Sequence, residues 1–300
     1  MNPGQPTGAR HNVDFPWQAR VFDRANINKL PAGRPIDEPA ARRCIMALNP
    51  HKLTDSSPAL EVHLLGRLDF DQAEQFQQRL IYEAGGRADG QITVLVCEHN
   101  PIITVGRDGS YADVRLSTKE LISRQLELRW VNRGGGCLIH GPGQLAVYPI
   151  VPLEHRGWSV GEYLRRFQAG LMAMLESLGI SGETKEGRYG VWARTGLVAA
   201  MGVAVRDWTT YHGAFINVCP TLELHRYVDT DPYGGRTMSS LVAARRRPIK
   251  MTAIRAALTA PLAEAFGCDR YHLHTSHPLL AQIESTRTSP APAEIPVRAY

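Results

Sequence analysis

A glycine-rich stretch between residues 133 and 149 constrains the fold of this chain more than any other part of the sequence. It reads R-G-G-G-C-L-I-H-G-P-G-Q-L-A-V-Y-P, holds five glycines, and ends in an apolar segment typical of a β-strand. Glycine permits positive φ and lets backbone amides approach a ligand that a Cβ would keep away. We therefore expect a loop that leads into a strand and grips a carbonyl, a phosphate or an acyl chain. A plain turn is the alternative explanation for such a glycine run.

Several common cofactor sites do not fit the sequence. No Lys-Ser or Lys-Thr pair follows the glycines, which excludes a Walker A loop, and a strand follows where a dinucleotide fingerprint needs a helix. The five cysteines are scattered and form no C-x-x-C pair, so neither a zinc site nor a disulfide framework is predicted. We expect no metal and no cofactor.

The order of apolar runs and helical patterns predicts one mixed α/β domain over residues 59–285. Residues 1–58 are rich in Pro, Gly, Asn and Arg and are predicted to be an irregular extension, and residues 286–300 a disordered tail. Helices are expected over 71–83, 117–124, 160–178 and 251–266, and strands over 61–65, 91–98, 102–105, 126–132, 145–151, 190–193, 197–205 and 209–218.

The chain is mildly basic. The formal net charge is +5, with a pI near 9.0 that comes from arginine. This charge suits an acidic protein partner as well as it suits nucleic acid. Because the sequence has no stripe of basic residues interleaved with aromatic ones, nucleic-acid binding is not expected. The sequence contains no run of eighteen apolar residues and no signal peptide. We expect a monomeric cytoplasmic protein that does not associate with membranes.

Seven blocks of the sequence together resemble one family, the lipoyl(octanoyl) transferases. The blocks are L-G-R-L-D-F-D-x-A at 65–73, E-H-N-P-I-I-T-V-G-R at 98–107, R-G-G-x-x-x-x-H-G-P-G-Q-L at 133–145, G-V-W at 190–192, A-A-M-G-V at 199–203, H-G-A-F-I-N-V at 212–218 and D-P-Y-G-G at 231–235. They follow the family's order over roughly residues 60 to 270. The long third block is specific, whereas E-H-x-P alone would not be.

The resemblance implies the fold of lipoate and biotin protein ligases, a mixed sheet flanked by helices. It also implies an activity: transfer of an octanoyl group, without ATP, from octanoyl-acyl carrier protein to a lysine of a lipoyl domain. The acceptor would be a lipoyl domain of a 2-oxoacid dehydrogenase complex or the glycine cleavage H protein. The residues implied to contact the acyl group are Arg133, Gly134, Gly135, His140, Gly141, Gln144, Ala200, Met201, Gly202, His212, Gly213 and Ala214.

The sequence departs from the family at its two catalytic positions. The family uses a cysteine that takes the acyl group as a thioester and a lysine beside it that favours the thiolate. In this chain the lysine position is Leu197 and the cysteine position is Tyr233. A tyrosine hydroxyl with a pKa of about 10 is a poor acyl carrier at neutral pH, and leucine carries no charge. The covalent route of the family is therefore not expected here.

Three interpretations follow from this departure. The nucleophile is relocated to Cys137 or Cys219, both close in sequence to the resembling blocks. Alternatively, the acceptor lysine attacks the acyl thioester directly, with His140 or His212 as general base and backbone donors around the oxyanion. In the third interpretation, the protein is a non-catalytic homologue that binds octanoyl- or lipoyl-carrying partners without turnover. A ligase that activates a free acid with ATP is the least favoured alternative, because such relatives also depend on the lysine.

Overall fold

The computed structural model describes residues 59–229, 238–278 and 280. The predicted extension over 1–58 and the predicted tail from 286 lie outside the described residues, as does Tyr233. Among the described residues, no helix is long and apolar enough to cross a membrane.

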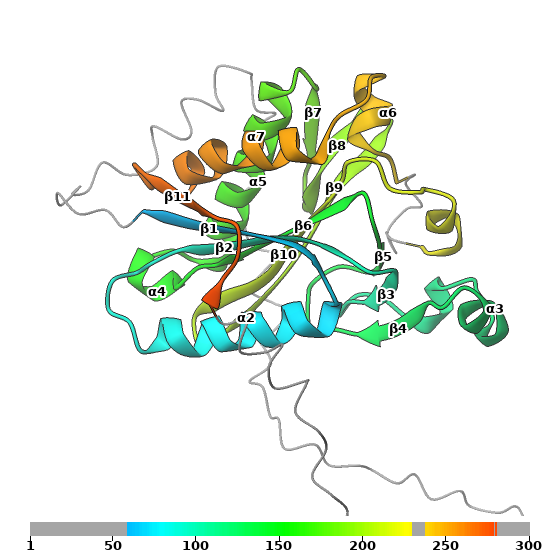
Figure 1. The fold of residues 1–300 in the computed structure, drawn as a ribbon, viewed down its shortest axis with the longest axis horizontal. Helices are drawn as coiled ribbons and strands as arrows, with labels where there is room; N and C mark the ends of the chain where they lie inside the picture. Colours follow the sequence, from blue (N-terminus) through cyan, green and yellow to red (C-terminus); the bar gives the residue numbers. More distant parts are fainter. Residues whose placement is uncertain (1–58, 230–237, 279, 281–300) are drawn as a thin grey trace, which may run out of the picture. The chain divides into compact units, whose positions relative to one another are not determined.

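A mixed sheet of eight strands forms the centre of the fold (Figure 1). Its order is β11 (Tyr271–His274), β1 (Leu60–Leu68), β2 (Thr93–His99), β6 (Gln144–Ile150), β10 (Thr209–Asn217), β9 (Gly196–Arg206), β8 (Arg188–Ala193) and β7 (Gly182–Lys185). β1 runs parallel to β11 and β2, and all later neighbours are antiparallel. The predicted mixed α/β fold is confirmed.

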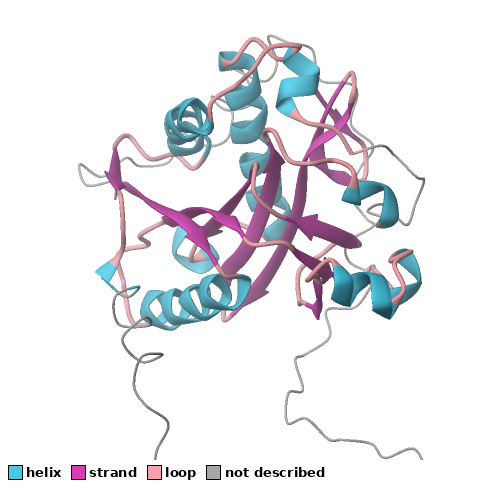
Figure 2. Ribbon diagram, turned by 45° about the vertical axis from the view of Figure 1, so that its right-hand side comes forward, coloured by secondary structure: helices cyan, strands magenta, loops and turns pink. Residues whose placement is uncertain are grey.

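Helices cover the two faces of this sheet (Figures 1 and 2). On one face, α5 (Val160–Ser177) and α7 (Met251–Ala265) bury apolar side chains against the strands in the largest core cluster. On the other face, α2 (Phe70–Gly85) packs onto the central strands through Ala73, Phe76, Leu80 and Ile81. All three helices were predicted, and Ser159 caps α5 as expected by accepting a hydrogen bond from the Glu162 amide.

A second sheet has the order β4 (Glu127–Trp130), β3 (Ile102–Val105) and β5 (Cys137–His140). β5 corrects the prediction of a continuous loop, because it lies inside the glycine-rich stretch. Its four residues alternate between two surroundings. Cys137 and Ile139 pack with β3 and the turn around Val114, whereas Leu138 joins the apolar layer under α2. This alternation is ordinary for a strand but too short to stand out among glycines.

Other short elements were not predicted from the sequence. They are β7, β11, α4 (Leu153–Arg156), α6 (Leu241–Arg245) and the 3-10 turns Tyr111–Asp113 and Leu224–Tyr227. The predicted short helix is present as α3 (Thr118–Ser123). β11 is exposed at all four residues and lies at the sheet edge, so it lacks the apolar pattern that identifies a strand.

Candidate functional site

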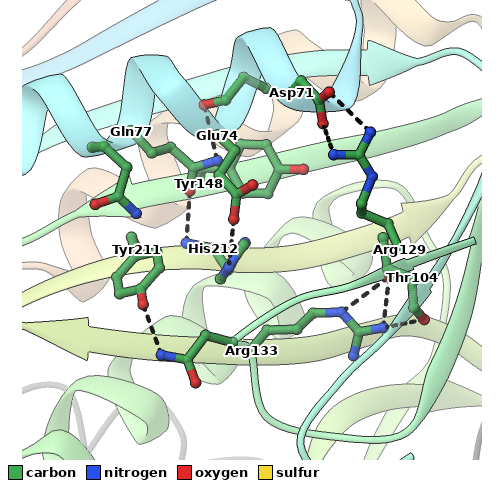
Figure 3. A network of polar contacts seen from close by, with 12 residues as sticks. Asp71, Glu74, Gln77, Thr104, Arg129, Arg133, Tyr148, Tyr211 and His212 are labelled. Carbon is green, nitrogen blue, oxygen red and sulfur yellow. Dashed lines mark hydrogen bonds and ion pairs between the residues drawn. The ribbon is translucent and has the colours of Figure 1, made fainter. Parts of the chain in front are cut away.

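Arg133 is the largest fully buried side chain of the chain's described part. Its guanidinium donates hydrogen bonds to uncharged oxygens, from Nη2 to Thr104 Oγ1 at 2.7 Å and to Thr104 O at 3.0 Å, and from Nη1 to Gly134 O at 3.0 Å (Figure 3). Burial lowers its pKa to about 10, so the group is still a cation at neutral pH. A buried cation whose hydrogen bonds all go to uncharged oxygens is costly, and such groups are typical of a functional site.

A chain of hydrogen bonds runs from Arg133 through β3 and β5 of the small sheet to β6 and β10 of the main sheet. Thr104 Oγ1 accepts from Arg133, so its own hydrogen goes to His140 Nε2 at 2.8 Å. His140 Nδ1 then donates to Gln144 Oε1 at 2.8 Å. Gln144 Nε2 donates in turn to Ile139 O at 3.1 Å and to Asn217 Oδ1 at 2.9 Å. The chain fixes the tautomer of His140 and the orientation of the Gln144 amide.

These contacts determine what His140 can do chemically. Burial and the nearby Arg133 cation both lower the pKa of His140 well below its usual range, so the ring is neutral. Its one lone pair, on Nε2, already accepts the Thr104 hydroxyl. A general base needs a free lone pair within reach of the proton it takes. In this geometry His140 therefore positions its neighbours and its ring packs 4.3 Å from Phe215, centroid to centroid.

Three glycine amides of the stretch donate hydrogen bonds to other groups of the protein. We expected their amides to face a ligand, but the Gly134 amide donates to Val203 O, the Gly135 amide to Asp108 Oδ2, and the Gly143 amide to Glu98 Oε2. The expectation of free donors is wrong at these three positions. Gly143 is needed for close packing instead, because its φ is +86° and a Cβ there would lie 2.6 Å from Cys219 O. Gly202 on β9 is needed in the same way, since a Cβ there would lie 2.5 Å from Gly134 O.

His212 occupies an unusual position near the opposite end of β10. Its φ of +53° is in the left-handed region, and its amide donates to Gln77 Oε1 at 2.7 Å. This conformation breaks the alternation of the strand and turns the ring toward α2, beside Tyr211 (Figure 3). Both ring nitrogens are buried, and neither has a hydrogen-bond partner among the described residues. The nearest carboxylate oxygen is Glu74 Oε1, 3.9 Å from Nε2.

The electrostatics around His212 favour uncharged groups. Burial, and then the cations Arg133 and Arg107, lower the pKa of His212 to about 3. The pKa of Glu74 is raised, first by its own burial and then by the charge of Asp71. At 3.9 Å the pair is a close contact, and the low pKa of His212 shows that burial outweighs attraction by the carboxylate. His212 is neutral at physiological pH.

The predicted contact residues separate into two faces of the main sheet. Ala200 packs on the same side as Phe215 and Leu138, and Gly202 faces Arg133. The side chains of Met201 and Ala214 belong instead to the core under α5 and α7. Gly213 lies against the neighbouring strand, where a Cβ would come within 2.0 Å of Val147 O, and Gly141 is in the turn before β6. The residues that lie together on the α2 side of the main sheet are therefore Arg133, His140, Gln144, Ala200, Gly202 and His212.

Leu197 lies in the apolar layer on this same side. It is 8 % exposed and clusters with Trp192, Ala200 and Met238. The Ser239 amide donates to Leu197 O at 2.9 Å, so the chain that follows the undescribed residues 230–237 returns directly beside it.

The two candidate cysteines are not brought together. Cys137 points to the outer side of β5, where its thiol donates to Ser110 O at 3.3 Å, away from His140. Burial raises the pKa of this thiol, which is the opposite of what a reactive thiolate requires. Cys219 is exposed and follows the end of β10. Within the described residues, no three His, Cys, Asp or Glu side chains are placed to hold a metal ion.

Several residues of the site were not predicted from the sequence. Thr104 and Asn217 lie inside two of the resembling blocks, in E-H-N-P-I-I-T-V-G-R and H-G-A-F-I-N-V, so the blocks themselves were a usable signal. Gln77 and Glu74 lie on α2, where the amphipathic pattern gives no hint of a polar role. Gln77 is 1 % exposed, and it supports His212 from a separation of 135 residues.

The neutral state of His212 predicts a loss of stability in acid. An unfolded histidine has a pKa near 6.5 and binds a proton at pH 5, whereas the folded residue, with a pKa of about 3, does not. The contribution of neutral His212 to the unfolding free energy is therefore fully present above pH 6.5, and it is lost as the pH falls from 6.5 toward 3. We expect His212 to remove about 2 kcal/mol of unfolding free energy between pH 7.5 and pH 5. Urea unfolding of wild type and His212→Gln at both pH values measures this, and equal losses in the two proteins would contradict it.

Comparison with known sequences finds a match to the family model of the lipoyl protein ligase A/B catalytic domain over residues 70–263. An octanoyltransferase of Geotalea uraniireducens is 36% identical over 200 residues, which cover 65% of this chain and 88% of that protein. An octanoyltransferase of Syntrophotalea carbinolica is 34% identical, covering 66% of this chain and 90% of that protein.

Solved structures have the same fold at low sequence identity. Lipoate-protein ligase A, crystallised with ATP, superposes with a TM-score of 0.62 at 12% identity, covering 76% of this chain and 94% of the other. A bi-partite lipoate protein ligase from Thermoplasma acidophilum gives a TM-score of 0.58 at 14% identity, covering 76% and 91%. The predicted fold, a mixed sheet flanked by helices like that of lipoate protein ligases, is confirmed.

Proposed function

The chain belongs to the lipoyl protein ligase A/B catalytic-domain family, and we propose from this membership that it transfers an octanoyl group from octanoyl-acyl carrier protein to a lysine of a lipoyl domain. The acceptors are lipoyl domains of 2-oxoacid dehydrogenase complexes or the glycine cleavage H protein, and the reaction takes place in the cytoplasm. The domain over residues 59–285 carries the activity.

One observation carries the proposal. The two blocks most typical of the transferases, around residues 98–107 and 133–145, fold into a single buried network that runs from Arg133 through Thr104 and His140 to Gln144. The network faces the small side chains of β9, at Ala200 and Gly202. An acyl chain fits a space lined by apolar and small residues with a few fixed polar groups. Relatives named octanoyltransferase at 34–36% identity support the same activity.

The reaction proposed here is a direct transfer without an acyl-enzyme. The lysine amine of the lipoyl domain attacks the thioester carbon, a C–N bond forms and the C–S bond breaks. The leaving thiolate takes the proton that the amine loses, so no group of the protein is consumed. Proximity of the two substrates supplies much of the rate in such a reaction. Leu197 in an apolar cluster and the raised pKa of Cys137 both support this route over a covalent one.

His140 and His212 take different roles in this proposal from the general-base role expected for them. His140 positions the network, because both its nitrogens are engaged. His212 on β10 lies opposite Val203 on β9. Val203 is six residues after Leu197, so His212 lies roughly 20 Å along the strand from Leu197. We place the reacting carbonyl near Leu197, so His212 and Glu74 lie at the far end of the acyl-binding space.

A non-catalytic homologue is the second candidate function. What supports it is Leu197, at the position that the resemblance assigns to the lysine, because it packs with Trp192 and Met238 as an ordinary core residue. Such a protein would bind octanoyl- or lipoyl-carrying partners through the same buried network and release them unchanged. Its ligand surface would be that of the transferase, so only turnover separates the two candidates.

Replacing His140 with alanine is expected to abolish acyl binding. The change leaves the Thr104 hydroxyl and Gln144 Oε1 without their partner and opens a cavity beside Phe215, so the acyl surface loses its shape. Calorimetric titration with octanoyl-acyl carrier protein measures the effect. His155→Ala, which changes a histidine of the short helix α4, is the control and should bind as wild type. Unchanged binding by His140→Ala would remove the central role given to the network.

The transfer itself is tested with three purified proteins. The chain is incubated in catalytic amount with octanoyl-acyl carrier protein and an unmodified lipoyl domain, and the mass of the lipoyl domain is followed. The proposal predicts a mass increase of one octanoyl group, which disappears when the acceptor lysine is changed to arginine. If the carrier binds but the mass of the lipoyl domain does not change, the transferase proposal is rejected and the non-catalytic homologue is supported.

A further inference from the structure

The Asn217 side chain ends the buried network with an unused donor. Asn217 is completely buried, and its Oδ1 accepts a hydrogen bond from Gln144 Nε2 at 2.9 Å. Its Nδ2 has no hydrogen-bond partner among the described residues. A buried amide nitrogen with two unused hydrogens is costly for the folded state, and such groups in native proteins call for an explanation.

The orientation of this amide follows from its neighbours. Gln144 Nε2 donates to the backbone oxygen of Ile139, which cannot donate in return, so that atom of Gln144 must be the nitrogen. The atom of Asn217 facing the Gln144 nitrogen must then be the oxygen. The Gln144 oxygen is occupied by His140 Nδ1. The network therefore leaves the Asn217 nitrogen as the one group at its end that is free to donate.

The position of Asn217 connects it to the family's catalytic positions. Its strand neighbour Val218 accepts a hydrogen bond from the Val242 amide, and Leu197 accepts one from the Ser239 amide. Ser239 therefore lies beside the start of β9, and Val242 lies beside the end of β10, where Asn217 is the last residue. Asn217 and Leu197, the position that the resemblance assigns to the lysine, thus lie at the same end of two neighbouring strands.

We propose that the Asn217 side-chain amide is the oxyanion donor of this site, holding the carbonyl oxygen of the acyl thioester. The inference rests on the proposed transfer. When the lysine nitrogen bonds to the thioester carbon, the carbonyl electron pair moves onto the oxygen, and Asn217 Nδ2–H donates to the negative charge. When the pair returns, the C–S bond breaks and the thiolate leaves with the amine proton. A preorganised donor of this kind stabilises the transition state more than the substrate.

The backbone amides of the stretch are less available as donors. Those of Gly134, Gly135 and Gly143 are used within the protein. Gln144, itself held by His140, fixes the orientation of the Asn217 amide. We expect Asn217→Asp to lower kcat for transfer by about 10²–10³-fold with little change in KM for the carrier.

The closing experiment observes the carbonyl itself and does not depend on turnover. Octanoyl-acyl carrier protein labelled with ¹³C at the carbonyl carbon is mixed with the full chain, and the carbonyl resonance is recorded. A hydrogen bond to the oxygen moves this resonance downfield, and we expect that shift in wild type. Asn217→Asp keeps the oxygen that Gln144 requires and removes the donor, so the resonance should return toward that of the free carrier. Asn217→Ala, which has no side-chain donor and is checked for folding by thermal unfolding, is the second variant.

Gln78→Glu is the matched control, because it makes the same amide-to-acid change at a half-buried residue of α2, whose Oε1 accepts a hydrogen bond from Arg206 Nη1 at 2.8 Å. Its carbonyl resonance should equal that of wild type. A downfield shift that persists in both folded Asn217 variants would overturn the inference while leaving the transfer proposal intact. If both variants lose the shift but wild type forms no octanoylated lipoyl domain, Asn217 is supported as the donor to the carbonyl and the transfer proposal is rejected. A carrier that does not bind wild type would reject both.

Discussion

Replacing Arg133 with methionine is expected to destabilise the protein by about 3 kcal/mol and to abolish acyl binding. Methionine fills similar space but leaves Thr104 O, Thr104 Oγ1 and Gly134 O without the donors that the guanidinium supplies. Each buried acceptor left without a donor costs about 1–3 kcal/mol. The desolvation cost of the cation is relieved at the same time, so the net loss is smaller than the sum. Urea unfolding at pH 7.5 measures the effect.

Arg129→Met provides the matched control for this prediction. Arg129 lies on β4 and pairs with Asp71 and Glu127, but its side chain is 42% exposed. Exposed ion pairs contribute about 0–1 kcal/mol, so the same substitution should leave stability and acyl binding nearly unchanged. Equal losses in the two variants would show that the buried network around Arg133 has no special weight in this fold.

Introducing a lysine and a cysteine together, as Leu197→Lys with Tyr233→Cys at the positions that the sequence resemblance assigns to this pair, is expected to create an acyl-enzyme. A lysine cation beside a cysteine lowers the pKa of the thiol, and the resulting thiolate attacks the thioester of the carrier. Intact-protein mass spectrometry with octanoyl-acyl carrier protein should show a gain of one octanoyl group on the double variant and none on wild type. The two substitutions are expected to act together, because a buried lysine alone only adds an unpaired charge to an apolar cluster.

The control for this double variant is Leu197→Lys with Tyr233→Ser, which carries the cation and no thiol. It should stay unmodified. A folded Lys–Cys double variant that gains no mass would mean that the two positions do not meet in this protein. The proposed placement of the reacting carbonyl near Leu197 would then be wrong.

The long elements of the fold were predictable from the sequence because each carries its own pattern. α5 has apolar residues at helical spacing between Ser159 and Leu178, and β10 and β9 are long apolar runs. β5 was not predictable in the same way. Its four residues lie between glycines, and they form a strand only because β3, more than thirty residues earlier, pairs with them. A local pattern cannot show a partner of that kind.

The site was predictable as a set of blocks but not as a set of roles. The structure links Arg133 and His140 through Thr104, while the contact of either residue with an acyl group stays a prediction. Their chemistry, however, depends on Thr104, 36 residues before His140, and on Asn217, 73 residues after Gln144. The Thr104 hydroxyl occupies the lone pair of His140, which changes the expected role of that histidine from base to positioning residue. Likewise, the amides of Gly134 and Gly135 donate hydrogen bonds to Val203 O and Asp108 Oδ2, and the spacing of the sequence does not reveal these contacts.

The most direct test of the proposed mechanism is a single-turnover reaction followed by intact mass of all three proteins. The chain, octanoyl-acyl carrier protein and lipoyl domain are mixed in equal amounts and quenched at successive times. Direct transfer predicts that the lipoyl domain gains one octanoyl group as the carrier loses it, while the mass of this chain never changes. An octanoyl group appearing on this chain first, and then passing to the lipoyl domain, would contradict direct transfer and reveal a relocated nucleophile such as Cys219 or Cys137.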